Sequence, residues 1–547
     1  MTDRGANSGD GRAARRLAQP ELFRPPLSYP EAPYGDLLAR AVALHPENEA
    51  IVHPDGSLTF REVEGLTNAF AQALRGLGIG RGDRVCLYMT NRPEYAVAFF
   101  ALARLGAVAS PMNPSYRERE VAYQIEDSEA VAVVVQHDLL PLVSAVRPGL
   151  PRLEHVIGVG PGRPAAGSDV LHFADLVARH PAVPVTGVPV VLDDLLTLPY
   201  SSGTTGLPKG VLLSHRAFGW NNIQFIAVSR ITERDRLLVF LPFYHIYGLM
   251  LLGGALLSGA TLVIMERFDP AECCRLMEAH GVTLLFAVPP VMNALAAFPG
   301  IGAYRLGTVR HCMVGAAPVP PEMARRFREV TGIKVVQGYG LTEGGPLTHL
   351  NPVHDESINV LDSAGLPAHD TEQKIVDLDT GERELPPGEV GEVIVRGPQL
   401  MQGYWKAPEA TAAALRGGWL YTGDIGRLDE RGYLYIHDRK KEMIKYKGFG
   451  IAPAEIEALL FEHPAVADVA VIGKPDPAAG EVPKAFVVRR NDQAVTAEEL
   501  LGWARGRLAG YKSLHEVEFV EAIPKTASGK ILRRVLREQE RQRLGLA

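Results

Sequence analysis

Two hydrophobic patterns alternate along the first half of the chain. Short runs rich in branched and aromatic residues, such as RVCLYM at 84–89, are typical of buried strands. Between such runs, apolar residues recur at the spacing of one helix face, as in the set Val63, Leu66, Phe70 and Leu74. This alternation predicts an α/β fold in which helices cover a mostly parallel sheet.

The segment after residue 92 shows this alternation with defined ends. The run PEYAVAFFALARLG opens on Pro93 and closes on Gly106. Proline is favoured in the first turn of a helix, and glycine just after the last turn. The run AVASP that comes next has the composition of a strand. The stretch 84–111 therefore predicts a strand, a helix and a second strand packed as a βαβ unit.

The pattern changes after Gly365. Short strands such as EVIVRG and GYLYIHD alternate with turn-rich segments such as DLDTGERELPPGE, which indicates a small β-rich subdomain at about 360–438. Beyond it, we expect a compact α+β unit. Two helical patterns, IAPAEIEALLFEHP and AEELLGWARGRL, and two strand patterns, VADVAVIG and KAFVVRR, indicate it. We expect a disordered leader at 1–27, a large domain at 28–438 and a small domain at 439–547.

Composition narrows the class of protein. The 547 residues carry a net charge of −6, so the charge balance gives no reason to expect nucleic acid or an acidic membrane surface as a partner. The four cysteines have neither a disulfide pattern nor zinc-ligand spacing, and we interpret them as buried reduced thiols. Near the N-terminus no apolar segment of a signal peptide is visible, and a cytoplasmic protein is expected.

One stretch without charged residues, 237–265, is long enough to span a bilayer. Pro242, His245 and several glycines interrupt it, and its final run, ATLVIM, has the pattern of a buried strand. We therefore expect core elements here and no transmembrane span.

The segment YSSGTTGLPKG at 200–210 has the glycines, hydroxyls and lysine of a phosphate-binding loop. It fails the P-loop pattern, because Gly203 and Gly206 are too close together and Gly210 stands where a magnesium-binding hydroxyl belongs. Its hydroxyls and Lys209 still suit the phosphates of ATP. Taken alone, the segment fits a serine- and glycine-rich surface linker equally well.

Six further motifs follow this segment along the chain. They are FYHIYG, VGAAP, QGYGLTEGGP, YTGD, DRKKEMIKYKG and PKTASGKILR. Together with YSSGTTGLPKG they closely resemble the adenylate-forming superfamily, which contains acyl-CoA synthetases, non-ribosomal adenylation domains and firefly luciferase. The resemblance runs over about residues 30–540 and is nearest to the 4-coumarate and fatty-acid CoA ligases. It implies that 28–438 binds AMP and the acyl group, and that ATP, Mg²⁺ and coenzyme A are ligands.

The resemblance also implies a two-step reaction. A carboxylate first attacks the α-phosphate of ATP, which yields an acyl-adenylate and pyrophosphate, and coenzyme A then displaces AMP. Between the two steps the small domain is expected to rotate about a hinge at Asp438 and Lys441. The catalytic positions of the family correspond to Lys530, Glu343, Lys445 and His245.

The nucleotide-binding positions of the family fall within several of the motifs. They correspond to Ser201, Ser202, Gly203, Thr204, Thr205, Gly206, Lys209, Gly315, Ala316, Ala317, Tyr339, Gly340, Thr342, Asp424 and Arg439. Thr205 and Glu343 are expected to bind magnesium. Lys530 is expected to hold the substrate carboxylate against the α-phosphate, although by itself such a lysine is usually just solvated. His245 is expected to gate the acyl pocket, with a hydrogen-bonded core histidine as the alternative.

The acyl pocket of the family is also recognisable. It corresponds to Ile246, Tyr247, Leu251, Met313, Ala316, Gly338, Pro346 and Leu347. All but Tyr247 lack a polar side chain, so we expect a hydrophobic carboxylic acid, whether aryl, fatty or polycyclic. The positions that line the tunnel for coenzyme A correspond to Lys447 and Gly448.

One position departs from the family pattern. The relatives' KYKGFQVAPAE reads KYKGFGIAPAE here, so that Gly450 replaces a glutamine that assists the reacting conformations. We expect a complete ligase. The alternative is an enzyme in which adenylation is weak and transfer from a supplied acyl-adenylate to coenzyme A survives.

Other classes of function stay open. An amino-acid adenylating enzyme is disfavoured, because the apolar run FYHIYGLMLL offers no carboxylate for an ammonium group. Luciferase-like oxygenation uses the same adenylate, and the sequence does not separate it from ligation. A nucleotide sensor without catalysis is disfavoured because Lys530 and Glu343 are both present.

Overall fold

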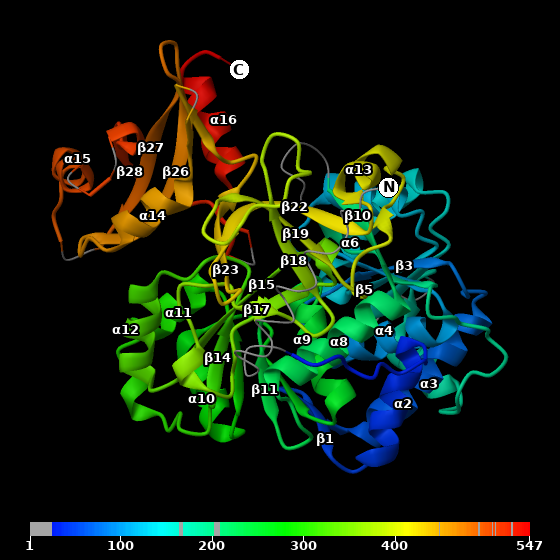
Figure 1. Ribbon diagram of the computed structural model, residues 1–547. Coiled ribbons are helices and arrows are strands. Elements are labelled where there is room, and N and C mark those ends of the chain that lie inside the picture. The colour runs from blue at the N-terminus through cyan, green and yellow to red at the C-terminus, as the bar shows by residue number, and fades with distance from the viewer. Residues whose placement is uncertain are drawn as a thin grey trace, which may run out of the picture.

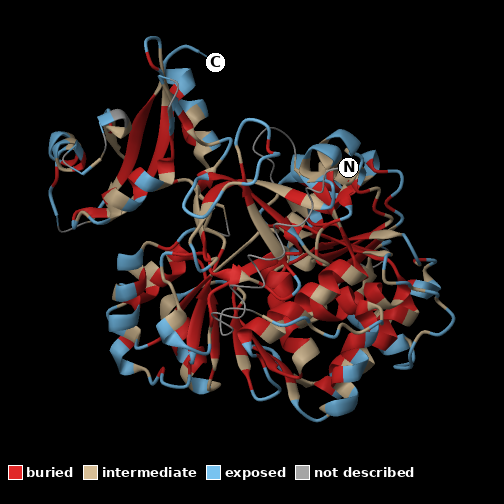
Figure 2. Cartoon of the chain, in the orientation of Figure 1, coloured by how far each residue is buried: buried red, intermediate tan, exposed pale blue. Residues whose placement is uncertain are grey.

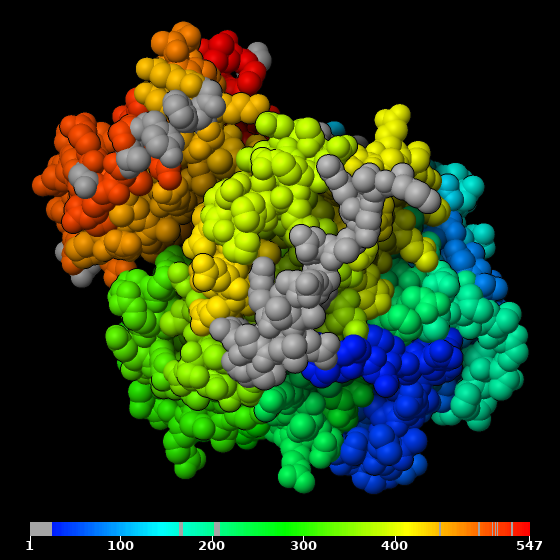
Figure 3. All heavy atoms as spheres, in the orientation of Figure 1, coloured from blue at the N-terminus to red at the C-terminus, as the bar shows by residue number. Residues whose placement is uncertain are grey.

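The structure is a computed structural model that describes residues 24–162, 168–201, 208–447, 449–490, 493–505, 507–508, 510–526 and 529–546. The described residues form four sheets with their covering helices. Three sheets belong to a large body and the fourth to a smaller lobe (Figure 1). In the space-filling view the orange and red residues of the lobe lie against the yellow and green parts of the body (Figure 3).

The first sheet is parallel in its centre and antiparallel at its edges. In spatial order its strands are β17 (Leu366–Pro367), β16 (Leu347–Leu350), β15 (Val335–Gly340), β14 (His311–Val314), β13 (Leu284–Ala287), β11 (Arg236–Val239), β12 (Thr261–Ile264), β1 (Glu49–His53) and β2 (Gly56–Thr59). The pairs β1–β2, β15–β16 and β16–β17 are antiparallel, and the pairs between them in the sheet are parallel. Strands β13 and β14 are buried along their whole length, as is typical when helices cover both faces of a parallel sheet.

The second sheet contains the predicted βαβ unit. In spatial order its strands are β20 (Gly403–Tyr404), β10 (Lys209–Ser214), β8 (Leu195–Thr197), β4 (Val108–Pro111), β3 (Arg84–Tyr88), β5 (Ala132–Gln136), β6 (His155–Val159) and β7 (Leu171–His172), with β9 (Tyr200–Ser201) beside β10. Strands β3 and β4 pair in parallel, and α4 (Pro93–Leu105) connects them. Gly106 ends this helix with a left-handed φ of 63°, which confirms the predicted boundary.

The third and fourth sheets are mostly antiparallel. The third contains β18 (Glu372–Val376), β19 (Gly391–Arg396), β22 (Trp419–Leu428), β21 (Leu415–Arg416) and β23 (Leu434–Arg439). The fourth contains β25 (Phe449–Ile451), β24 (Ile444–Tyr446), β27 (Gly480–Arg489), β26 (Val466–Asp476) and β28 (Glu516–Phe519). The α/β body and the small lobe confirm the predicted fold class.

The helices of the body cover its first two sheets and flank the third. They are α2 (Tyr34–Leu44), α3 (Phe60–Gly76), α4, α5 (Glu118–Asp127), α6 (Leu140–Val146), α7 (Phe173–Arg179), α8 (His215–Ser229), α9 (Ile246–Ser258), α10 (Pro270–Ala279), α11 (Pro289–Ala296), α12 (Pro321–Thr331) and α13 (Pro408–Ala414). Those of the lobe are α14 (Pro453–Phe461), α15 (Ala497–Arg505) and α16 (Arg533–Arg543). Buried residues concentrate on the sheets of the body and on β26 and β27 (Figure 2).

Two expectations about the core hold. The predicted face of α3 buries Val63, Phe70 and Leu74, while Leu66 packs partly buried against the same core. All four cysteines are buried and free.

The uncharged stretch 237–265 supplies most of β11, all of α9 and β12. Within the described residues, no helix combines the length and the hydrophobicity that a bilayer crossing requires.

The first described residues, 24–27, fall within the predicted leader at 1–27 and form a strap on the body. The Arg24 guanidinium donates to the carbonyl oxygens of Leu350, Leu366 and Pro367 at 2.7–2.9 Å. Burial lowers the pKa of Arg24 to about 10. Three carbonyls at the edge of the first sheet thus hold residues 24–27 in place. The remainder of the predicted leader lies outside the described residues.

Candidate active site

A cavity lies where the lobe meets the body. Its walls are the first turn of α9, the carboxyl ends of β14 and β15, and the 3-10 helix Thr342–Gly344. Its lining residues are His245, Ile246, Tyr247, Met250, Met313, Val314, Gly315, Ala316, Gly338, Tyr339, Gly340, Leu341, Thr342, Pro346, Leu347 and Lys530. The carboxyl ends of parallel strands are the usual place for ligands in open α/β sheets. Thirteen of the sixteen lining residues are predicted site residues, all but Met250, Val314 and Leu341.

Tyr339, Asp424 and Arg439 form a polar group beside this cavity. The Tyr339 hydroxyl donates to Asp424 Oδ2 at 2.5 Å, and Arg439 Nε lies 3.1 Å from Asp424 Oδ1. Asp424 and Arg439 face each other across β22 and β23. Burial and the Asp424 charge raise the pKa of Tyr339 well above its ordinary value, so the hydroxyl stays a donor. An aromatic face next to a carboxylate and a guanidinium fits a nucleoside, with the carboxylate at the ribose hydroxyls.

Glu343 is the acidic residue of the 3-10 helix. Its Oε1 accepts hydrogen bonds from the Ser201 hydroxyl at 3.2 Å and from the Tyr404 hydroxyl at 2.9 Å. Among the described residues, no group of three or more His, Cys, Asp and Glu could hold a metal ion alone. A single carboxylate suits Mg²⁺ that arrives with a nucleotide, because this ion keeps several waters and takes phosphate oxygens as ligands. The residues present therefore fit magnesium.

Lys530 lies on a hairpin of the lobe that is described at 524–526 and 529–532. Backbone hydrogen bonds and a bridge join its two arms. The neighbouring Gly529 has a φ of +80°, in the left-handed region that favours glycine. A Cβ at this position would lie 3.1 Å from two ring atoms of Pro290 in α11. The absence of a side chain at residue 529 thus lets the hairpin tip approach the body closely.

Lys530 and His245 line the same cavity. Burial and the Arg439 charge lower the pKa of Lys530 below its ordinary value. Burial and the Lys530 charge lower the pKa of His245 to about 3, so the imidazole is neutral at neutral pH. His245 Nδ1 accepts a hydrogen bond from Tyr247 N at 3.3 Å and so caps α9. His245 is therefore a lining residue whose ring is also held by the fold.

One residue predicted for the acyl pocket, Leu251, does not line this cavity. Leu251 is fully buried in the core and does not line the cavity, whereas Met250 does. Met250 follows Tyr247 by three residues, and residues three apart share a helix face, so this spacing could have identified it. Val314 and Leu341 also line the cavity and were not predicted. The other residues predicted for the acyl pocket line this cavity, and their role in acyl binding stays a prediction: Ile246, Tyr247, Met313, Ala316, Gly338, Pro346 and Leu347.

Several predicted residues lie elsewhere. Lys209 is exposed at the start of β10, and its Nζ lies 5.7 Å from the centre of the Tyr404 ring. Ala317 follows the lining residues of its motif without lining the cavity. Lys445 and Lys447 are exposed on the lobe, at the hairpin of β24 and β25. The predicted residues outside the described part of the chain are Ser202, Gly203, Thr204, Thr205, Gly206 and Gly448.

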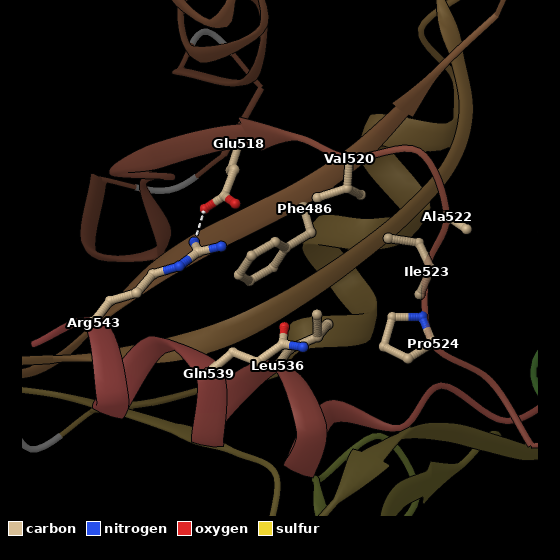
Figure 4. A pocket seen from close by; sticks show the side chains of 9 residues that line it. All are labelled: Phe486, Glu518, Val520, Ala522, Ile523, Pro524, Leu536, Gln539 and Arg543. Atoms are coloured by element: carbon tan, nitrogen blue, oxygen red, sulfur yellow. Dashed lines mark hydrogen bonds and ion pairs between the residues drawn. The ribbon is translucent and has the colours of Figure 1, made fainter. Parts of the chain in front are cut away.

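A second cavity, of about 350 Å³, lies within the lobe between β27, β28 and α16 (Figure 4). Six of its nine lining residues are apolar, and an ion pair of 2.6 Å between Arg543 and Glu518 lies on one side. It shares no lining residue with the cavity at Lys530 and contains none of the predicted site residues.

Comparison with known proteins identifies the family of the chain. Residues 38–405 match the family model of the AMP-binding enzyme, and 455–530 match that of the AMP-binding enzyme C-terminal domain. A 4-coumarate–CoA ligase 5 of Oryza sativa subsp. japonica is 40% identical, over 88% of this chain and 89% of the relative. A long-chain-fatty-acid–CoA ligase of Bacillus subtilis (strain 168) is 35% identical, over 94% of this chain and 96% of the relative.

Solved structures extend the likeness to three dimensions. The crystal structure of the anthranilate CoA ligase AuaEII in complex with anthranoyl-AMP is 29% identical, with a TM-score of 0.88 over 94% of this chain and 98% of that one. The chain belongs to the adenylate-forming family of AMP-binding enzymes. It is an ATP-dependent, AMP-forming acid–CoA ligase.

Proposed function

We propose that the enzyme performs both half-reactions, adenylation and thioester formation, on a hydrophobic carboxylic acid that lacks an amino group. The observation that carries the proposal is the position of Lys530, which the lobe places in the same cavity as the apolar wall and the Tyr339 ring. Arg439, Asp424 and Glu343, which lie beside the proposed nucleotide position, are among the charged groups that act electrostatically on it.

Lys530 is proposed to act in adenylation. A carboxylate oxygen of the substrate forms a bond to the α-phosphorus of ATP, and the bond from this phosphorus to the bridging oxygen of pyrophosphate breaks. Negative charge grows on the phosphoryl oxygens during this exchange, and a protonated lysine held beside them stabilises it. The positive charge also draws the carboxylate toward the phosphorus. Glu343 would hold a magnesium ion that arrives with the nucleotide, and the ion would neutralise further phosphate charge.

The acyl wall supports a hydrophobic substrate. Of the described residues that line the cavity, none carries a carboxylate, so an α-ammonium group gains no charged partner there. The Tyr247 hydroxyl already donates to the Met313 carbonyl oxygen at 3.3 Å, within the protein. Methionines 250 and 313 add flexible apolar surface that adapts to different acyl shapes.

Thioester formation is proposed to use the other face of the lobe. Lys445 and Lys447 are exposed there, and Gly450 pairs with Lys445 across β24 and β25. Gly450 is itself exposed and does not line the cavity that holds Lys530. A side chain missing at Gly450 therefore leaves the adenylation geometry untouched, which favours the complete ligase over an enzyme with weak adenylation.

A panel of carboxylic acids tests this function. Each acid is assayed in two ways, by ATP–pyrophosphate exchange for adenylation and by acyl-CoA release for the full reaction. Aryl, medium-chain and long-chain fatty, and polycyclic acids are compared with amino acids of matched size. We expect both activities with at least one hydrophobic acid and neither with the amino acids. Robust exchange with amino acids alone would contradict the substrate class, and acyl-CoA formation only from synthetic acyl-adenylate would contradict the complete reaction.

A further inference from the structure

The hairpin that carries Lys530 is fixed at both of its arms. On the first arm, the Lys525 ammonium lies 2.6 Å from Asp468 Oδ2 in β26. On the second arm, α16 starts at Arg533, three residues after Lys530. The position of Lys530 therefore depends on what holds these two arms to the lobe.

Arg533 binds two acidic side chains from different parts of the lobe. Its Nε and Nη2 donate to the two carboxylate oxygens of Glu457 in α14, at 3.2 and 2.6 Å. Its Nη1 donates to Glu442, which lies in the turn just after β23. Such a two-pronged contact fixes the plane of the guanidinium as well as its position.

The same cluster reaches the predicted hinge. Asp438 Oδ2 accepts a hydrogen bond from Ala454 N in the first turn of α14, at 2.9 Å. Arg537, one turn further along α16, donates to the backbone carbonyl of Glu442 at 2.9 Å. The hinge strand, α14 and the second arm of the Lys530 hairpin thus meet at Arg533.

The cluster depends on Arg533 for its charge balance. Burial raises the pKa of both Asp438 and Glu457, so water is largely withdrawn from these carboxyls. Burial also opposes the charge of Arg533, but Glu457, Asp438 and Glu442 outweigh it and raise its pKa. One guanidinium therefore acts on three acidic groups, and its loss removes the cation that pairs directly with Glu442 and Glu457.

We propose that Arg533 is a positioning residue that holds Lys530 in the adenylation site. It is not one of the residues that line the cavity, so it acts through the hairpin. The inference rests on the proposed role of Lys530. Its consequence is selective: adenylation depends on Arg533, whereas thioester formation, which uses the exposed hairpin of β24 and β25, does not.

The first test compares two neighbouring arginines. Arg533→Gln removes the cluster's cation, and Arg534→Gln removes the same charge from an exposed position on the same helix. Adenylation is measured by ATP–pyrophosphate exchange, and thioester formation by transfer from synthetic acyl-adenylate to coenzyme A. We expect Arg533→Gln to lower exchange by about 10- to 100-fold, as misplacement of a reacting group by about 1 Å does. Transfer changes by less than about twofold, as do both activities in Arg534→Gln. Equal losses in the two half-reactions, or equal losses in the two variants, overturn the proposal.

A second test separates positioning from folding. Arg533→Gln/Glu457→Gln removes one buried carboxylate together with the cation, so that the lobe keeps a smaller charge imbalance. In this double variant we expect the unfolding temperature to recover toward that of the parent while exchange stays low, because the hairpin is still unanchored. Recovery of exchange together with stability overturns the positioning role.

A third test asks whether Arg533 acts through Lys530. Lys530→Ala is compared with Lys530→Ala/Arg533→Gln, and we expect the two to show the same residual exchange, since there is no lysine left to position. A further loss in the double variant overturns the proposal. Lys530→Ala by itself reports on the proposed function: full exchange in that single variant contradicts the role of Lys530, independently of Arg533.

Discussion

The lobe carries two hairpins with lysines, and they are held in opposite ways. The hairpin 524–532 inserts Lys530 between lobe and body, with Gly529 close to Pro290. The hairpin of β24 and β25 leaves Lys445 and Lys447 exposed, and its main tertiary contacts join it to β27 of the same lobe. The lobe thus places Lys530 at the cavity, whereas Lys445 and Lys447 lie away from it.

The contrast between the two hairpins indicates which proposed half-reaction this arrangement of lobe and body suits, namely adenylation. The hairpin of Lys530 approaches the body closely, and ion pairs hold its base to the lobe. These contacts place Lys530 where the proposed adenylation needs it. The exposed hairpin carries Lys445 and Lys447, which we propose for the second step, and neither lysine lines the cavity in this arrangement. Under the proposed domain rotation, the two hairpins exchange these situations.

Replacing the inserted lysine should have the largest effect. Lys530→Ala is expected to lower ATP–pyrophosphate exchange by about 10²- to 10³-fold, because it removes a charge beside the reacting phosphoryl group. Transfer from synthetic acyl-adenylate should fall far less. Lys447→Ala is the matched change in the exposed hairpin, and there the larger loss should be in transfer. The same ranking of losses in both variants would contradict a division of labour between the hairpins.

The pH dependence of exchange should come next in size. Only protonated Lys530 can stabilise phosphoryl charge, and its lowered pKa means that this form is lost as pH rises through a value below the ordinary 10.5. Above that value exchange should fall about tenfold per pH unit. Profiles of exchange and of transfer are measured on the same preparation. An alkaline limb that persists unchanged in Lys530→Arg would assign the titration to another group.

A methyl group at the hairpin tip offers a smaller perturbation. Gly529→Ala adds a Cβ in a left-handed conformation, 3.1 Å from Pro290, and should lower exchange about tenfold by holding the tip away from the body. Gly450→Ala is the control in the other hairpin, where the added Cβ meets only the end of the Met443 side chain. Exchange in Gly450→Ala should stay within about twofold of the parent. A stronger effect from the control would show that the tip contact is not what matters.

Restoring the family residue at Gly450 should have the smallest effect on adenylation. Because residue 450 is exposed and outside the cavity, Gly450→Gln should change exchange by less than about twofold. Any gain is expected in the transfer assay. A large rise in exchange would instead favour the alternative of an enzyme with weak adenylation.

Local sequence patterns predicted the elements whose signals are local. The helix from Pro93 to Gly106 and its flanking strands follow from spacing and end residues, and the structure confirms them. Helix α16 was not predicted, because its sequence RRVLREQERQR has too few apolar residues to show the spacing of a helix face. Its first residue, Arg533, finds its partners 76 and 91 residues earlier, and a charged residue in such a run looks solvated from sequence alone.

In the site too, some features could be predicted from the sequence and others depend on how distant elements pack. Motifs placed Tyr339, Glu343 and Lys530 near one another, because the family resemblance carries long-range information. The resemblance does not specify which way each side chain points. It therefore predicts Leu251 in the pocket, whereas α9 turns Met250 to the cavity and buries Leu251 in the core. Direction depends on how α9 packs, which no short pattern encodes.

The strap at Arg24 has a consequence for how the protein is made. Its partner carbonyls come 326 to 343 residues later in the chain. At about 5–20 residues per second, a ribosome needs on the order of tens of seconds to deliver them after Arg24 emerges. The start of the described chain must therefore wait, unpaired, while the body forms. Its docking is a late event of synthesis, at a time when most of the first sheet is already available to receive it.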